Sequence, residues 1–210
     1  MPFRARTSRD TYTRYEMPVG ICIPDVLSVV GSWNVKRTPK LRRWTHQHSF
    51  LTWALRSRGP LAVDQVAGLA YQSVEKMAEL ADDLLSCAVL IETSDGNLRL
   101  APRCPLLLAQ VWAVELKLTR WRNALEQARQ YLDFADIVVV GMDPDGVKRA
   151  NSACFRELGI GLAAIGRGAT RWLVAPRKRR LVELGPDHDY IIGSVLSRRT
   201  HTLWSRKKDA

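Results

Sequence analysis

Residues 111–118 read Val-Trp-Ala-Val-Glu-Leu-Lys-Leu, so an acid and an amine stand two positions apart in an apolar segment. The pattern predicts a β-strand, in which side chains alternate between two faces. Glu115 and Lys117 would therefore share one face with Val111 and Ala113. A carboxylate can hold a divalent metal ion while a neighbouring ammonium group contacts a phosphate or an attacking water. This pair suits metal-assisted hydrolysis of a phosphodiester.

The segments after this strand predict an α/β arrangement. A helix is expected over residues 121–132, with apolar residues spaced for one buried stripe and with Gln127 and Tyr131 four positions apart on one face. The apolar run 137–141 is typical of a strand covered on both faces. A helix over residues 147–158, closed by Gly159, and two strands over residues 160–165 and 170–175 complete this part.

Two further strands are expected near the N-terminus, over residues 12–30, joined by a turn at Gly20. Asp25 would lie in the second of them, directly after Pro24, which favours an edge or a bulge. Two strands are too few to bury a core alone. We therefore expect them to pair with the α/β segment that lies much later in the chain.

The middle of the chain has a helical pattern. A basic connector, residues 36–43, precedes three expected helices: one that ends at Gly59-Pro60, one over residues 61–69, and one that starts after an N-cap at Ser73. Residues 89–93 and 98–100 flank an Asp-Gly turn and predict a hairpin. Three helices followed by a hairpin is the order of a winged helix-turn-helix.

These segments predict an α/β (α+β) fold with a central mixed sheet flanked by helices. Residues 1–35 and 106–210 would form two parts of one core, the second with a basic, solvated C-terminal tail. Residues 36–105 would be an inserted winged-helix domain.

The order Pro24-Asp25, Glu115-Leu116-Lys117 and Gln127 to Tyr131 resembles the PD-(D/E)xK nuclease superfamily. That superfamily has a restriction-endonuclease-like core, and its RecB-like branch carries a Q-x-x-x-Y element after Glu-x-Lys. Two departures stand out. The insertion separates Asp25 from Glu115 far more than is usual in the family, and the leading helix of the core is short or absent.

The resemblance implies a metal-dependent deoxyribonuclease. Asp25, Glu115 and the carbonyl of Leu116 would hold Mg²⁺ or Mn²⁺. Lys117 would orient or deprotonate the attacking water, or balance charge at the phosphate. Gln127 and Tyr131 would hold the water or the nucleic-acid backbone beside the metal. Taken without the resemblance, Glu115 and Lys117 can equally be a surface ion pair.

The charge balance indicates a polyanionic partner. The formal net charge is +11, from 32 basic and 21 acidic residues, and DNA is the expected partner. Two basic runs are the candidate phosphate contacts: Lys36, Arg37, Lys40, Arg42 and Arg43, and then Arg177, Lys178, Arg179 and Arg180. The third helix is acidic, and acids repel phosphate. A protein-binding or positioning role for the helical insert is therefore as plausible as insertion of this helix into the DNA groove.

Other classes are disfavoured. No apolar run is long enough for a bilayer, and the N-terminus lacks the apolar region of a secretory signal, so we expect a cytoplasmic protein without a membrane partner. The four cysteines have no Cys-x-x-Cys spacing, and a structural zinc site is not expected. Two alternatives to a nuclease stay open: a DNA-binding winged-helix protein or regulator with an inactive core, and an interaction subunit. A homodimer and either mode of cleavage also stay open.

Overall fold

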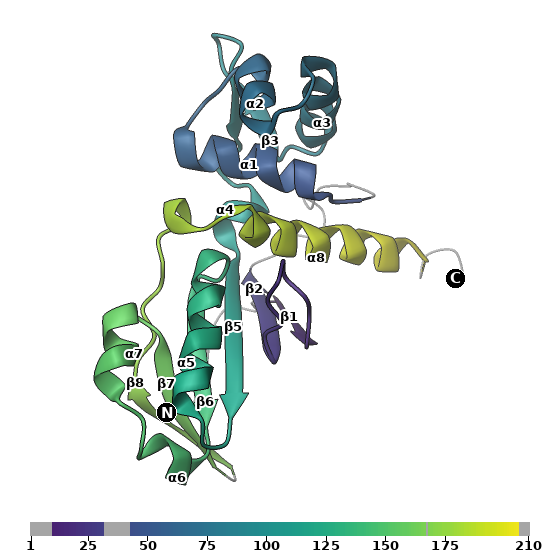
Figure 1. Ribbon diagram of the computed structural model, residues 1–210. Coiled ribbons are helices and arrows are strands. Elements are labelled where there is room, and N and C mark those ends of the chain that lie inside the picture. Colours follow the sequence, from purple (N-terminus) through teal and green to yellow (C-terminus); the bar gives the residue numbers. More distant parts are fainter. Residues whose placement is uncertain (1–9, 32–42, 167, 206–210) are drawn as a thin grey trace. The chain divides into compact units, whose positions relative to one another are not determined.

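The computed structural model describes residues 10–31, 43–166 and 168–205 (Figure 1). The chain forms two compact units, and each is built from segments that are not contiguous in the sequence. Residues 11–30 and 110–184 form the first, called the sheet unit here. Residues 43–109 and 185–205 belong to the second, called the helical unit.

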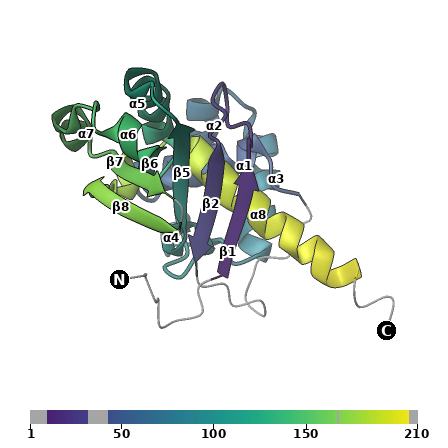
Figure 2. The same cartoon turned by 90° about the horizontal axis from the view of Figure 1, so that it is seen from below.

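The sheet unit contains a mixed six-stranded sheet with the order β1-β2-β5-β6-β7-β8 (Figure 2). β2 is antiparallel to β5, β5 and β7 both run parallel to β6, and β8 is antiparallel to β7. The strands are β1 (Asp10–Tyr15), β2 (Val26–Gly31), β5 (Gln110–Lys117), β6 (Ile137–Met142), β7 (Gly161–Gly166) and β8 (Ala169–Val174). The helical segments of this unit are α5 (Trp121–Gln130), the 3-10 turn η2 (Tyr131–Asp133), α6 (Pro144–Val147), α7 (Ser152–Leu158) and the 3-10 turn η3 (Leu181–Glu183). The expected α/β class, with a mixed sheet and flanking helices, is confirmed.

β5 and β6 have the burial that their sequences predict. Along β5, Val111, Ala113 and Glu115 are buried, whereas the alternate residues are half-buried or exposed. In β6, every residue after Ile137 is buried, as expected of a central parallel strand. The period-two pattern of β5 therefore places Glu115 on the face that packs into the core of the unit.

Three expected elements differ from the structure. The second N-terminal strand begins only at Val26, so Asp25 lies directly before β2 and not within it. Pro24 has no amide hydrogen to give to a ladder, which explains the late start. The single helix expected over residues 147–158 is two short helices, because Pro144 starts α6 and the side chain of Asn151 caps α7. α5 ends at Gln130 and tightens into η2.

The helical unit has the predicted order of three helices and a hairpin. Its elements are α1 (His46–Arg58), α2 (Val63–Ala70), α3 (Val74–Ser86), β3 (Leu90–Glu92), β4 (Leu98–Leu100), α4 (Pro105–Leu108) and α8 (Pro186–Ser205). Ser73 caps α3 by accepting a hydrogen bond from the amide of Lys76, as its position predicts. Thr45 caps α1, and the imidazole of His48 completes a capping box.

α8 groups with this unit, whereas the sequence interpretation assigned residues 106–210 to the core with the sheet. Ile191, Ile192 and Val195 are buried, so this end of the chain carries an apolar stripe rather than only solvated charge. α8 also packs closely on the Trp44 ring. A Cβ atom at Gly193 would lie 2.1 Å from Trp44 Cδ2, which is why only glycine fits there.

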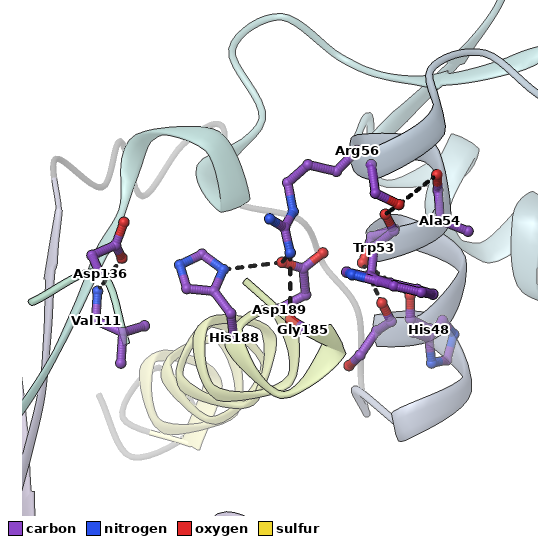
Figure 3. Close-up of polar contacts among 12 residues, drawn as sticks. His48, Trp53, Ala54, Arg56, Val111, Asp136, Gly185, His188 and Asp189 are labelled. Carbon is purple, nitrogen blue, oxygen red and sulfur yellow. Dashed lines mark hydrogen bonds and ion pairs between the residues drawn. The ribbon is translucent and has the colours of Figure 1, made fainter. Parts of the chain in front are cut away.

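A buried charged cluster joins α1 to α8 (Figure 3). Arg56 Nη2 lies 3.1 Å from Asp189 Oδ1, and both side chains are almost fully buried. His188 Nδ1 is 3.1 Å from the same oxygen.

Within the parts of the chain that the structure describes, no helix is long and apolar enough to cross a membrane.

Candidate active site

The start of β2 brings Asp25 to the end of β5. Val26 lies opposite Val114 in the antiparallel register, so one further step along the ladder sets Asp25 opposite Glu115. The carboxylate of Asp25 accepts a hydrogen bond from the amide of Leu116 at 2.7 Å. Leu116 is the middle residue of Glu-Leu-Lys. The two far-separated sequence segments therefore meet at one end of two neighbouring strands.

The carboxylate of Glu115 is buried, since only 1% of the residue is exposed, and each of its two oxygens has a partner. Its Oε1 lies 2.7 Å from Lys117 Nζ, and its Oε2 accepts a hydrogen bond from the Tyr131 hydroxyl at 2.6 Å. The Lys117 side chain is 32% exposed. A buried charge is stable only when it is paired and hydrogen-bonded, and these two contacts meet that requirement.

The electrostatics link the same residues. The hydrogen bond with Glu115 raises the pKa of Lys117 above its ordinary value; partial burial opposes the shift, and the charges of Glu115 and Asp25 add to it. Burial, followed by the hydrogen bond with Glu115, raises the pKa of the Tyr131 phenol well above its ordinary value. Near neutral pH the lysine is therefore a cation and the tyrosine a neutral hydrogen-bond donor.

Gln127 and Tyr131 do not lie in the same environment. Tyr131 is 2% exposed and continues the buried stripe of Ala124 and Ala128, whereas Gln127 is exposed on α5. Sequence reasoning placed both on one helix face. Tyr131 follows Ala124 by seven positions and Ala128 by three, so ordinary helical spacing sets its ring on the buried stripe, at the residue where η2 begins. Tyr131 contacts the acid, and Gln127 contacts neither Asp25 nor Glu115 among the described residues.

The oxygen donors at this end of the sheet suit a hard divalent ion. Two carboxylates, Asp25 and Glu115, and the backbone carbonyl of Leu116 are the ligand types that Mg²⁺ prefers, and Mg²⁺ keeps several of its own waters. In the described part of the chain, no group of three or more His, Cys, Asp or Glu residues is placed to hold a metal. A metal here would therefore depend on the carbonyl and on water for its other ligands, and it would compete with Lys117 for Glu115.

The predicted phosphate contacts lie partly outside the described residues, which do not include Lys36, Arg37, Lys40 and Arg42. Arg43, at the edge of the helical unit, is exposed. Within the second basic run, Arg177, Lys178 and Arg180 are exposed as well.

Arg179 is the least exposed member of the second run, although Arg177 and Arg180 also make hydrogen bonds within the sheet unit. It is half-buried, its amide donates to the carbonyl of Asp136 at 2.9 Å, and its guanidinium lies 3.5 Å from Glu183. The exposed members of the run are therefore its better candidates for a phosphate contact.

Sequence reasoning missed the loop before Asp25. The Tyr131 hydroxyl also reaches the carbonyl of Ile23 at 3.4 Å, and the thiol of Cys22 lies 3.5 Å from Gln130 Oε1. It also missed Arg120 and Arg122, both exposed just beyond the end of β5. Their place a few residues after Glu-x-Lys in the sequence is the signal that could have marked them as further basic candidates.

Comparison with known proteins adds little to this geometry. No family model matches the chain, and no curated protein matches it. One solved structure, a Silicibacter pomeroyi protein of unknown function, is 15% identical, with a TM-score of 0.32. The similarity covers 47% of this chain and 63% of that protein. It is too weak to bear on either fold family or function.

Proposed function

We propose that the chain is a cytoplasmic, Mg²⁺-dependent deoxyribonuclease with a PD-(D/E)xK, restriction-endonuclease-like core. The observation that carries this proposal is the hydrogen bond from the Leu116 amide to Asp25, which sets the isolated aspartate beside the Glu-Leu-Lys segment. The strand order supports it: β2 pairs antiparallel with β5, and α5 crosses over to the parallel strand β6. That is the order of strand, strand, helix and strand expected for such a core.

Each residue has a role that its environment permits. Asp25, Glu115 and the Leu116 carbonyl would hold the ion, which when bound supplies Lewis acidity and a more acidic water. Lys117, a cation in its contact with Glu115, would neutralise charge that develops on the phosphate, or would orient or deprotonate the attacking water. Tyr131 is a positioning residue that fixes Glu115.

The helical insert belongs to the proposal as a winged helix that positions DNA or binds a protein. Its third helix, α3, exposes Glu75, Glu79, Asp82 and Asp83. Carboxylates repel phosphate, so this face favours the protein-binding or positioning role over insertion into the major groove.

The test is cleavage of supercoiled plasmid and of labelled single-stranded DNA in Mg²⁺. Glu115→Gln and Asp25→Asn each remove a proposed ligand charge at nearly constant volume and should slow cleavage by at least about 100-fold. Glu126→Gln is the matched control, because Glu126 is an exposed glutamate on α5. The proposal fails if the wild-type chain yields no product, or if Glu115→Gln cuts at the wild-type rate.

One observation favours a second candidate, a DNA-binding protein or regulator with an inactive core. Both oxygens of Glu115 already have partners, as in a structural ion pair. Mg²⁺ would then leave the melting temperature unchanged, because an ion that does not bind the folded state cannot stabilise it. An active core instead predicts a melting temperature that rises with Mg²⁺ in the wild type and not in Glu115→Gln.

Sedimentation of the same samples decides between monomer and homodimer.

A further inference from the structure

The loop between β1 and β2 exposes two isoleucines next to the candidate acids. Ile21 is 95% exposed and Ile23 is 56% exposed, whereas the residues around them, Val19 and Cys22, are buried. The chain therefore alternates at this tip, with its anchors directed into the fold and its isoleucines directed to solvent. Asp25 follows two residues after Ile23.

The tip is firmly held. Val19 and Cys22 exchange two backbone hydrogen bonds, of 2.8 and 2.9 Å, which close a two-residue turn over Gly20 and Ile21. Gly20 has a φ of 56°, a conformation that glycine adopts without strain. Cys22 reaches Gln130 on α5, and the Ile23 carbonyl lies 3.4 Å from the Tyr131 hydroxyl. Because the backbone is fixed in advance, a ligand that meets this tip does not have to order it.

The same tyrosine hydroxyl connects this tip to the acid. Tyr131 donates to Glu115 at 2.6 Å and lies 3.4 Å from the carbonyl of Ile23. Ile23 also lies two residues before Asp25, whose carboxylate accepts from the Leu116 amide, so the tip adjoins the proposed ligands along the chain. A DNA strand whose phosphate meets an ion at Asp25 and Glu115 would bring a neighbouring nucleotide to this tip. The part of a nucleotide that suits an aliphatic side chain is the flat face of its base, and proteins insert isoleucine between bases to unstack them.

We propose that Ile21 and Ile23 form a wedge that unstacks the bases beside the phosphate to be cut. The ligand is a DNA strand, and the wedge makes the chain prefer sites that open easily, such as mismatches, ends and single strands. The ligand class rests on the proposed nuclease function. The wedge itself depends only on DNA binding, so the two can fail separately.

The test uses the full chain, Ca²⁺ in place of Mg²⁺ so that the DNA stays intact, and duplexes carrying one 2-aminopurine at successive positions around a central mismatch. Emission of this base rises when it is unstacked. In the double variant Ile21→Ser/Ile23→Ser, the increase in emission should be at least about five-fold smaller than in the wild type. The affinity of this variant for the duplexes, measured by anisotropy, should differ from the wild-type affinity by less than about ten-fold. Val182→Ser is the matched control, because Val182 is 53% exposed elsewhere in the sheet unit.

Each outcome decides the inference. An emission rise that is equal in the double variant overturns the wedge, and so does a wild-type chain that binds these duplexes without any rise. Cleavage in Mg²⁺ together with an unaltered double variant leaves the nuclease proposal standing and removes the wedge. A rise that depends on the isoleucines, without cleavage, supports the wedge and removes the nuclease proposal. Urea unfolding of the variant confirms that the exposed serines leave the fold intact.

Discussion

Tyr131 has an apolar ring and a polar tip in very different surroundings. Its ring is buried beside Phe134, with ring centroids 5.8 Å apart, and its hydroxyl donates to the buried carboxylate of Glu115. Removing the hydroxyl leaves that oxygen without its donor, and an unsatisfied buried acceptor is more costly than the loss of an exposed hydrogen bond. One oxygen atom therefore connects the core of the sheet unit to the candidate site.

The variant Tyr131→Phe should lower the free energy of unfolding by about 1–3 kcal/mol at neutral pH. The wild-type value should also fall as pH rises past about 10, because the unfolded tyrosine then loses its proton while the folded one, with its raised pKa, keeps it. Phenylalanine has no such proton, so the fall in the variant should be shallower. Urea unfolding at about pH 7, 9 and 10.5 measures both effects. Tyr71→Phe, at a 95% exposed tyrosine, is the control and should behave as wild type.

Ala88 is the simplest case of backbone strain in the described chain. It follows the end of α3 with a φ of 55°, a left-handed conformation that non-glycine residues rarely adopt. It is exposed, so its methyl group contributes little packing. Ala88→Gly should raise the free energy of unfolding by roughly 0.5–1 kcal/mol. Ala78→Gly, inside α3, is the opposite control and should lower it by about 1 kcal/mol. Equal effects of the two changes would contradict this account.

For single residues, the sequence predicts burial correctly where the periodicity of a strand or helix determines it. The alternation of β5 correctly placed Glu115 among buried residues, because a strand has a strict period of two. It did not show that Tyr131 is buried while Gln127 is exposed, because two residues four positions apart can lie inside and outside the edge of one buried stripe. Nor could it show the contact between Asp25 and Leu116, which joins residues distant in the chain.

The first turn of α1 depends on a neutral imidazole. His48 Nδ1 lies 3.1 Å from the Thr45 amide and 2.7 Å from its hydroxyl, so it serves as the acceptor of the capping box. Burial lowers the pKa of His48, although Asp83 opposes the shift. A protonated imidazole has no acceptor nitrogen, so the cap is lost when His48 gains a proton.

The free energy of unfolding should therefore fall as pH drops from about 7 to about 5, because the unfolded histidine takes up a proton before the folded one does. His48→Gln should show a shallower fall, since glutamine at this position can still accept in a capping box and does not titrate. His46→Gln, at an exposed histidine in the same turn, should keep the wild-type pH dependence. Circular dichroism during urea unfolding at both pH values provides the comparison.

The contact between α1 and α8 contains the buried pair of Arg56 and Asp189. Asp189→Asn would leave a buried guanidinium without its counter-charge, and should lower the free energy of unfolding by about 3–5 kcal/mol. Asp187→Asn, in the same turn of α8 and only half-buried, should change it by less than about 1 kcal/mol. Chemical unfolding of the two variants measures the difference. Similar small losses in both would mean that the pair contributes little.

At the level of elements, the sequence predicted those that carry their own signals. The three helices and the hairpin of the helical unit follow from helical periodicity, caps and an Asp-Gly turn. α8 was missed because its apolar residues, including Ile191 and Ile192, were outweighed in the interpretation by the basic residues that follow them, such as Arg198 and Arg199. Its packing on α1 depends on residues more than 100 positions earlier in the chain, which local pattern does not reveal.

For the whole molecule, the net charge of +11 predicts strongly salt-dependent binding to DNA. Affinity for a duplex should fall by at least about 100-fold between roughly 50 and 200 mM salt. Binding releases counterions condensed on the DNA, and this release favours binding less when the salt concentration is high. Arg177→Ala/Arg180→Ala should reduce the slope by about one per lost phosphate contact. Lys76→Ala, on the acidic helix α3, should leave the slope unchanged. Fluorescence anisotropy across a salt series measures the slopes, and an affinity that does not depend on salt would contradict the assignment.

The two units take their segments from the chain alternately, and this has a consequence for biosynthesis. The ribosome releases β2 long before its partner β5, and α1 long before α8. Both units are therefore incomplete while the middle of the chain is being synthesised. The sheet unit is complete at residue 184, whereas the helical unit is complete only after α8 has been made. A message shortened after residue 184 would encode the entire sheet and still leave α1 without its partner helix, so quality control should remove that product.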